Sequence, residues 1–291
     1  MNRKVPEVAT PDAAGLSAVV DLLGHWQVEG APLQLHPGDV GWYWRMGAEA
    51  TAAAVRTWSR DGRILAVGLL DGARQLRLAI APEAQHDLAL ARQLAADAGN
   101  PRRGVLPAGE AAIEAPVGAV LRDLLAADGW DAGVPWTPLR RDLSDPVEDP
   151  GARIEVAGPD TAAVRTAVHR SAFGRPSFTA ERWGALASGL PYAQARCLVA
   201  YDDADQPAAA ATVWSAGDGR PGLLEPLGVG TGHRGRGFGR AITRAAAAAL
   251  RDLGASSAVV CTPSSNVGAV STYLSGGFTD GPAVPDLHRG G

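Results

Sequence analysis

Apolar and polar positions in the second half of the chain repeat with two periods, close to two and close to 3.6 residues. Short apolar or alternating runs predict strands at residues 152–158, 196–201, 207–216, 223–229, 256–264 and, weakly, 278–284. Helical periodicity with capping signals predicts helices at residues 159–174, 179–189, 238–253 and 266–277. Strands and helices in this order indicate an α/β fold with a mixed, mostly antiparallel sheet flanked by helices.

The first half of the chain repeats this order in a less regular form. It predicts a hairpin within residues 62–83, a helix at 86–99, and a strand followed by a helix within 110–130. Two prolines, a glycine and several acidic residues predict a linker near residues 143–151. We therefore expect two domains of one fold in tandem, residues 1–145 and 151–291.

Composition limits the functions that such a protein can have. A formal net charge of −4 offers no general attraction for nucleic acid or an anionic membrane. No apolar run reaches about 18 residues, and the first residues lack the apolar core of a signal peptide, so a cytoplasmic location is expected. Cys197 and Cys261 lie in apolar strands without metal-ligand neighbours, which predicts two buried thiols and no metal site.

Glycine and arginine are concentrated between the strand at 223–229 and the helix that follows it. A helix N-terminus presents unpaired N–H groups and the positive end of the helix dipole. Glycines allow the backbone close to a ligand, and the guanidinium groups of Arg234, Arg236 and Arg240 suit phosphate oxygens. The stretch therefore predicts an anion site, most simply for a diphosphate.

Two other phosphate-binding motifs fit this stretch poorly. A P-loop requires a lysine, whereas Phe238 follows the glycines here. Gly230, Gly232 and Gly235 match the spacing of a dinucleotide-binding loop, but the next strand ends without the acidic residue that holds a ribose. That motif also opens its domain, whereas this one comes after a hairpin.

The loop resembles that of the Gcn5-related N-acetyltransferase (GNAT) superfamily, in which Arg-x-x-Gly-x-Gly/Ala binds the diphosphate of acetyl-CoA. Arg234, Gly237 and Gly239 occupy these positions. Downstream, Asn266, Ala269, Tyr273 and Gly277-Phe278 resemble the family's other recurring segment. The resemblance covers residues 151–285 and is only an outline over 5–142. The layout is similar to tandem GNAT proteins of actinobacteria, with a degenerate first copy that lacks the loop.

The resemblance implies acetyl-CoA as co-substrate, no metal, and a bulged strand that separates from its neighbour, for which Pro226 is suited. It assigns a general-acid role to Tyr273. Glu225, an acid in an apolar strand, is the base candidate, because burial would raise its pKa. The residues expected to bind the co-substrate are Leu227, Gly228, Val229, Arg234, Gly235, Arg236, Gly237, Phe238, Gly239, Arg240 and Asn266.

The expected acceptor is a small-molecule primary amine. His169, Phe173 and Trp183 lie in the helices that line the acceptor site in this family, and Trp214 lies on the strand facing them. Each residue is also compatible with simple core packing, as Asn266 is with helix capping. Two alternatives stay open, a non-catalytic acyl-CoA sensor or scaffold and the transfer of a longer acyl group. A monomer with an internal pseudo-dimer or a homodimer is expected.

Overall fold

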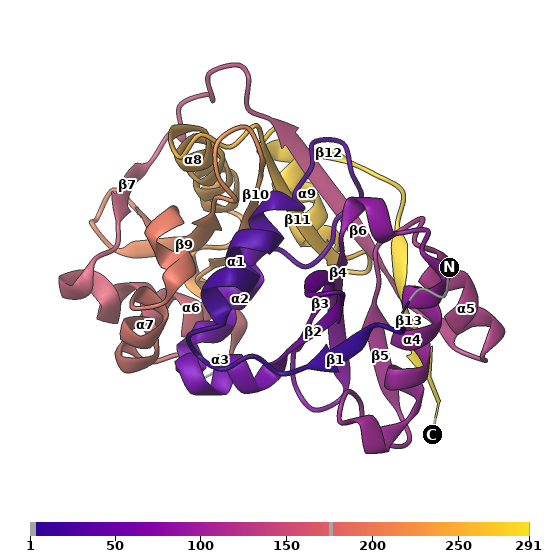
Figure 1. Cartoon of the computed structure of the whole chain (residues 1–291). Coiled ribbons are helices and arrows are strands. Elements are labelled where there is room, and N and C mark those ends of the chain that lie inside the picture. Colours follow the sequence, from indigo (N-terminus) through magenta and orange to yellow (C-terminus); the bar gives the residue numbers. More distant parts are fainter. Residues whose placement is uncertain (1–3, 175–176, 291) are drawn as a thin grey trace. The chain divides into compact units, whose positions relative to one another are not determined.

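The computed structural model describes residues 4–174 and 177–290, which form two compact units (Figure 1). The first unit takes the described residues up to His36, residues 48–136 and those from Ala283 on. The second takes residues 37–47 and the described residues of 137–282. Two segments therefore lie in a unit formed mainly by the other part of the sequence. Residues 37–47 belong to the second unit, and the described residues from Ala283 on belong to the first. The prediction of two contiguous domains does not anticipate this exchange.

The first unit is a mixed sheet with helices. Its strands, in spatial order, are β1 (Glu7–Ala9), β2 (Val55–Arg60), β3 (Arg63–Leu70), β4 (Gln75–Ile80), β5 (Ala111–Glu114), β13 (Val284–Arg289) and the first half of β6 (Asp131–Asp142). Only the β4–β5 pair among these is parallel. Its helical segments are α1 (Leu16–His25), α3 (Ala48–Ala54), η2 (Pro82–Ala84), α4 (Leu88–Gly99), η3 (Pro101–Arg103) and α5 (Val120–Ala127).

The second unit has the same kind of sheet. Its strands, in spatial order, are the second half of β6, then β11 (Ser257–Pro263), β10 (Pro221–Val229), β9 (Pro207–Trp214), β8 (Ala195–Tyr201) and β7 (Arg153–Val156), with β12 (Thr279–Asp280) paired to β6. Its α-helices are α2 (Pro37–Tyr43), α6 (Ala162–Phe173), α7 (Ala180–Ala187), α8 (Phe238–Asp252) and α9 (Val267–Ser275). Short 3₁₀ turns are η1 (Trp44–Met46), η4 (Pro159–Thr161), η5 (Leu190–Gln194) and η6 (Thr231–His233).

The mixed α/β fold predicted from the sequence is confirmed, and so are the strands and helices predicted up to α9. Of the last predicted strand, 278–284, only β12 forms within the range, and β13, which begins at its last residue, pairs with β5 and β6 in the first unit. Prolines at 282 and 285 interrupt a local alternation that was already weak.

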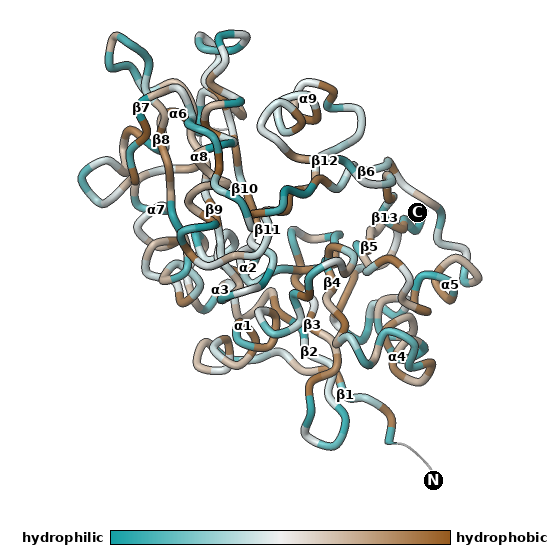
Figure 2. Tube along the Cα trace, turned by 90° about the horizontal axis from the view of Figure 1, so that it is seen from above, coloured by the Kyte–Doolittle hydropathy of each residue, from teal (hydrophilic) through white to brown (hydrophobic). Residues whose placement is uncertain are grey.

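The sheet of the second unit is apolar on both faces because helices cover both. One face packs against α8 through a core that includes Leu198, Val213, Leu224 and Ile242. The other carries Cys197, Val199 and Ala210 into a second core with Trp183 of α7. Figure 2 shows the hydrophobic colour along β8 and β9.

Two glycines let helix α2 pack closely against the rest of the second unit. A Cβ at Gly38 or Gly41 would overlap the indole of Trp214, so these positions have room for no side chain. Trp214 is 1% exposed under this cover. The close approach lets a seven-residue helix from the N-terminal part of the sequence complete the core of the second unit.

Candidate active site

Strand β10 is bulged and separates from β11 midway along its length. Its pairing with β9 shifts register between Leu224 and Leu227, where the Glu225–Pro226 peptide bond is cis. Its parallel pairing with β11 covers only residues 221–223, so the described residues of β11 do not pair with Leu227, Gly228 or Val229 of β10. Backbone groups there are available to a ligand, as the Pro226 position predicts.

The loop after β10 delivers the chain into an open helix N-terminus. Gly235 and Gly237 have φ of 73° and 90°, in the left-handed region that side chains disfavour. Gly237 is the N-cap of α8, and within the described chain no side chain hydrogen-bonds to the first amides of that helix. The first turn of α8 therefore retains unsatisfied N–H donors at the positive end of its dipole.

The three arginines of the loop differ in how they are held. The Arg234 Nη2 donates to the carbonyl oxygen of Ala172, at the end of α6, over 2.8 Å. The Arg236 Nη1 lies 3.8 Å from the Asp202 carboxylate, and Arg240 is exposed. All three side chains are at the surface beside the uncapped helix, where an anion can reach them.

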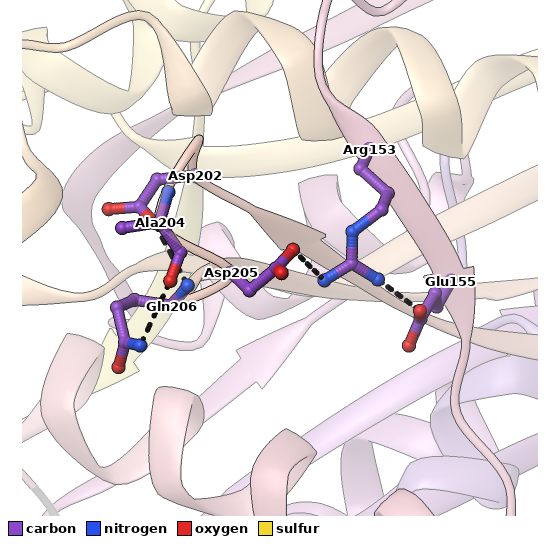
Figure 3. Close-up of polar contacts among 6 residues, drawn as sticks. All are labelled: Arg153, Glu155, Asp202, Ala204, Asp205 and Gln206. Atoms are coloured by element: carbon purple, nitrogen blue, oxygen red, sulfur yellow. Dashed lines mark hydrogen bonds and ion pairs between the residues drawn. The ribbon is translucent and has the colours of Figure 1, made fainter.

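The turn between β8 and β9 anchors this loop through Asp202. Its carboxylate accepts hydrogen bonds from the backbone of Gln206 and Ala204 and from the His233 Nε2 at 3.2 Å. These bonds, first among them that from Gln206, hold the pKa of Asp202 below its usual value. Figure 3 shows this turn, with Asp205 tied through Arg153 to Glu155. The His233 side chain is largely covered by this contact.

Glu225 lies close enough to Tyr273 to act on the ionisation of its phenol. The Tyr273 phenol is 6% exposed and its ring packs 5.9 Å from that of Phe278. Burial, and then the negative charges of Glu225 and Cys261, raise the pKa of Tyr273 far above its usual value. The backbone oxygen of Glu225 accepts from the Trp214 Nε1 at 2.7 Å. The bulge on β10 and helix α9 thus bring the two predicted catalytic residues to one region.

The prediction of two buried cysteines is wrong for Cys261. Cys197 is buried in β8, but Cys261 is exposed near the end of β11. The reason is the separation of the strands: β10 covers β11 only as far as Val259, two residues before Cys261. A thiol in an apolar run is exposed here because the strand beside it has diverged.

The predicted acceptor residues fall into two aromatic groups. His169 stacks against Phe173 at 4.6 Å, and Trp42 of α2 packs against His169 at 5.5 Å. Trp183 and Trp214 are joined by Tyr192, whose ring lies 6.0 and 6.2 Å from theirs. Trp42 and Tyr192 were not predicted. Tyr192 lies in an unremarkable 3₁₀ turn, and no local signal in residues 37–47 points to the second unit.

The remaining predicted residues lie along the open side of β10. Leu227 and Val229 are half-buried on β10, and Gly228 packs against Phe173. Gly239 and Phe238 are in the first turn of α8. The Asn266 side chain caps α9 by accepting from the Ala269 amide at 3.2 Å, so the capping interpretation of this residue is confirmed.

Within residues 4–174 and 177–290, no group of three or more His, Cys, Asp or Glu side chains is arranged to hold a metal ion. None of the helices in these ranges combines the length and the hydropathy needed to cross a bilayer.

Part of the second unit is similar to a known protein family. Residues 164–278 match the model of the acetyltransferase (GNAT) family. No curated protein sequence gives a significant match. Solved structures, however, match nearly the whole chain. A GCN5-related N-acetyltransferase from Sphaerobacter thermophilus is 20% identical with a TM-score of 0.58, over 98% of this chain and 95% of that one.

Two further structures have comparable similarity. A tandem GNAT protein from the clavulanic acid biosynthesis pathway is 16% identical with a TM-score of 0.59, over 98% of both chains. A GNAT-family acetyltransferase from Colwellia psychrerythraea is 14% identical with a TM-score of 0.61, over 97% of this chain and 99% of that one. At these identities the structures show a shared fold.

Proposed function

We propose that the second unit transfers an acetyl group directly from acetyl-CoA to a primary amine of a small-molecule acceptor, because residues 164–278 match the model of the acetyltransferase (GNAT) family. The observation that carries the proposal is the course of β10. It is bulged at Glu225, leaves β11 after Leu223, and ends in a glycine-rich loop before the uncapped helix α8. This offers a free strand edge and an anion site in sequence, matching a thioester arm attached to a diphosphate.

Binding then has two parts. Backbone groups of Leu227, Gly228 and Val229 hydrogen-bond the arm and its thioester. The diphosphate lies against the loop and the first turn of α8. The loop residues that bind it are Arg234, Gly235, Arg236, Gly237, Phe238, Gly239 and Arg240, with Asn266 beside the arm.

The chemistry needs a proton acceptor and a proton donor. Glu225 takes the proton that the amine loses as its nitrogen attacks the thioester carbonyl carbon. The carbon–sulfur bond breaks, an amide forms, and Tyr273 donates its phenolic proton to the departing thiolate. The raised pKa of Tyr273 keeps that phenol protonated at neutral pH, in the state that can donate.

The test is a thiol-release assay with acetyl-CoA and a panel of primary amines, together with calorimetric titration of coenzyme A. Glu225→Gln and Tyr273→Phe should each lower kcat about 100-fold, as loss of acid–base catalysis does. Both variants should still bind coenzyme A, because neither side chain contacts the diphosphate. A wild-type protein that binds no coenzyme A would contradict the proposal.

One observation favours a second function, a non-catalytic acyl-CoA-binding sensor. Tyr273 is buried in the core of the second unit together with Phe278, as a purely structural aromatic would be. A sensor would bind coenzyme A and release no thiol with any amine, so the same assay separates the two functions.

A further inference from the structure

Arg165 of the second unit is buried without a counter-charge among the described residues. Arg165, on α6, is 1% exposed, and its Nη2 donates to the Thr212 hydroxyl at 3.0 Å. Its Nε and Nη1 have no hydrogen-bond partner, and no carboxylate of the described residues forms an ion pair with it. A guanidinium in this state has lost its hydration and gained one neutral hydrogen bond.

The surroundings of Arg165 offer little compensation. The Phe178 ring lies 5.6 Å from the guanidinium carbon, and the side chains of Cys197 and Tyr192 are close enough to influence it. Burial is the largest influence and lowers the pKa of Arg165. A buried charge is ordinarily kept only where a partner or a ligand balances it, because desolvation costs several kcal/mol.

A second unsatisfied donor lies in the same core. The Trp183 indole is 5% exposed, and its Nε1 has no hydrogen-bond partner among the described residues. The Trp183 ring packs edge-on against Tyr192, which adjoins both Arg165 and Cys197. Three N–H-bearing atoms therefore lack acceptors in one aromatic-walled region. We name Arg165, Trp183, Tyr192, Cys197 and Thr212 the α6 donor cluster.

We propose that the α6 donor cluster binds the carboxylate of the acceptor, so that the acceptor is an amine that also carries an acid, as amino acids do. The ligand must be rich in acceptor atoms, because the unsatisfied atoms are all donors. A single guanidinium balances one carboxylate, whereas a phosphate dianion would leave a buried excess charge. This inference rests on the proposed acetyl transfer, since it specifies the substrate of that reaction.

The position of the cluster suits an acceptor with its amine and its acid at opposite ends. Tyr192 also packs edge-on against Trp214, and the Trp214 indole donates to the backbone of Glu225. A continuous series of contacts thus connects the cluster to the predicted base. Tyr192 is half-buried, while the other four members are at most 5% exposed. The acceptor therefore enters the cluster by displacing the Tyr192 ring.

The experiment pairs each of several amino acids that carry an amine at the end opposite the carboxylate with the amine that lacks only that carboxylate, such as L-lysine with cadaverine and 6-aminohexanoic acid with pentylamine. Thermal melting of the full chain is measured with each compound, and acetyl-CoA thiol release is measured alongside. The wild type should be stabilised more by the acid of at least one pair, and should turn that acid over at least about tenfold faster.

The variants identify the responsible group. Arg165→Met should abolish the preference for the acid without lowering the melting temperature of the free protein, because an apolar chain of similar length replaces an unbalanced charge. Trp183→Phe should reduce the preference less and serves as an independent variant. Arg182→Met, on α7, is the matched control and should leave the preference intact.

Equal shifts for acid and amine in every pair, including no shift at all, would overturn the inference. So would an Arg165→Met variant that keeps the preference, which is the result expected if the guanidinium is satisfied by buried water only. The melting temperatures of the same proteins are also measured with coenzyme A, as a separate readout. A coenzyme A shift without an acid preference removes this inference and leaves the proposed function standing, and an acid preference without a coenzyme A shift does the reverse.

Discussion

The two units follow the same path from a strand into a helix, but only the second leaves that junction open. In the first unit, β4 leads through η2 to α4, whose N-terminus is capped by the Asp87 carboxylate with bonds of 3.0 Å to the amides of Ala89 and Leu90. Asp87 also pairs with Arg60 at 2.7 Å. In the second unit, Gly237 occupies the N-cap of α8 and brings no anion of its own.

The strand edges differ in the same way. The Leu35 amide donates to the Leu78 carbonyl oxygen and the Ile80 amide to the Gln34 side chain, each over 3.1 Å, so chain from the same unit occupies β4 beyond its pairing with β5. The described residues of β11 supply no such bonds to β10 beyond Leu223. The first unit satisfies with its own atoms the backbone groups that, in the proposed function, the second unit uses to bind its ligand.

The largest expected effect comes from placing a carboxylate at the N-cap of α8, like the one that caps α4 in the first unit. Gly237→Asp should weaken coenzyme A binding about 100-fold, because a carboxylate at the helix N-terminus occupies the site and repels the diphosphate. Calorimetric titration measures the change. Gly237→Asn is the control, since it carries the same backbone strain at φ 90° without the charge. An equal loss in both variants would attribute the effect to strain alone and break the comparison.

An intermediate effect is expected at Cys261, which the separation of β10 from β11 exposes. Saturating coenzyme A should slow alkylation of Cys261 by a small maleimide about tenfold or more, because an arm along β10 would cover this side of β11. Mass spectrometry of the two cysteine peptides gives both rates. Cys197, buried in β8, is the internal control and should react little with or without the ligand. If saturating coenzyme A leaves the alkylation rate of Cys261 unchanged, the arm does not lie along β10.

The smallest effect should be found in the first unit. Asp87→Asn keeps a capping oxygen but loses the charge opposite Arg60, so the free energy of unfolding at pH 7 should fall by about 1 kcal/mol. The Arg60 hydrogen bond lowers the pKa of Asp87 below its usual 3.8. The stabilisation is therefore complete above about pH 4 and fades as the pH falls through the lower pKa of the folded state.

Denaturant unfolding at pH 7 and pH 3 measures this difference between the wild type and Asp87→Asn. Coenzyme A affinity at pH 7 is the second measurement and should be unchanged, because the substitution lies in the unit without the open loop. A stability loss as large at pH 3 as at pH 7 would show that the charge of Asp87 contributes nothing.

The parts of the site that sequence predicts well are those with local causes. Glycines before a helix, with no capping side chain, specify the open terminus of α8 wherever the helix packs. Pro226 lacks the N–H that a continuous ladder needs, so it marks the bulge directly. Asn266 caps α9 through a bond three residues away. Each of these signals acts within a few residues and does not depend on how distant parts of the chain pack.

Features that depend on distant packing could not be predicted. Cys261 has an apolar neighbourhood in sequence, and its exposure follows from where a different strand diverges. Arg165 occupies a helix position with no marker to distinguish a buried guanidinium from a solvated one. Trp42 reaches His169 only because Gly38 and Gly41 let α2 approach Trp214. No periodicity in residues 37–47 encodes that partner.

The exchange of residues 37–47 and β13 has a practical consequence for anyone who would cut this polypeptide in two. A fragment beginning at residue 151 would lose α2 and leave the indole of Trp214, next to the predicted base, bare to water. The complementary fragment would lack the strand that pairs with both β5 and β6. Neither piece is whole without a stretch that the other carries, so swapping halves between homologues requires that those two stretches travel with their packing partners.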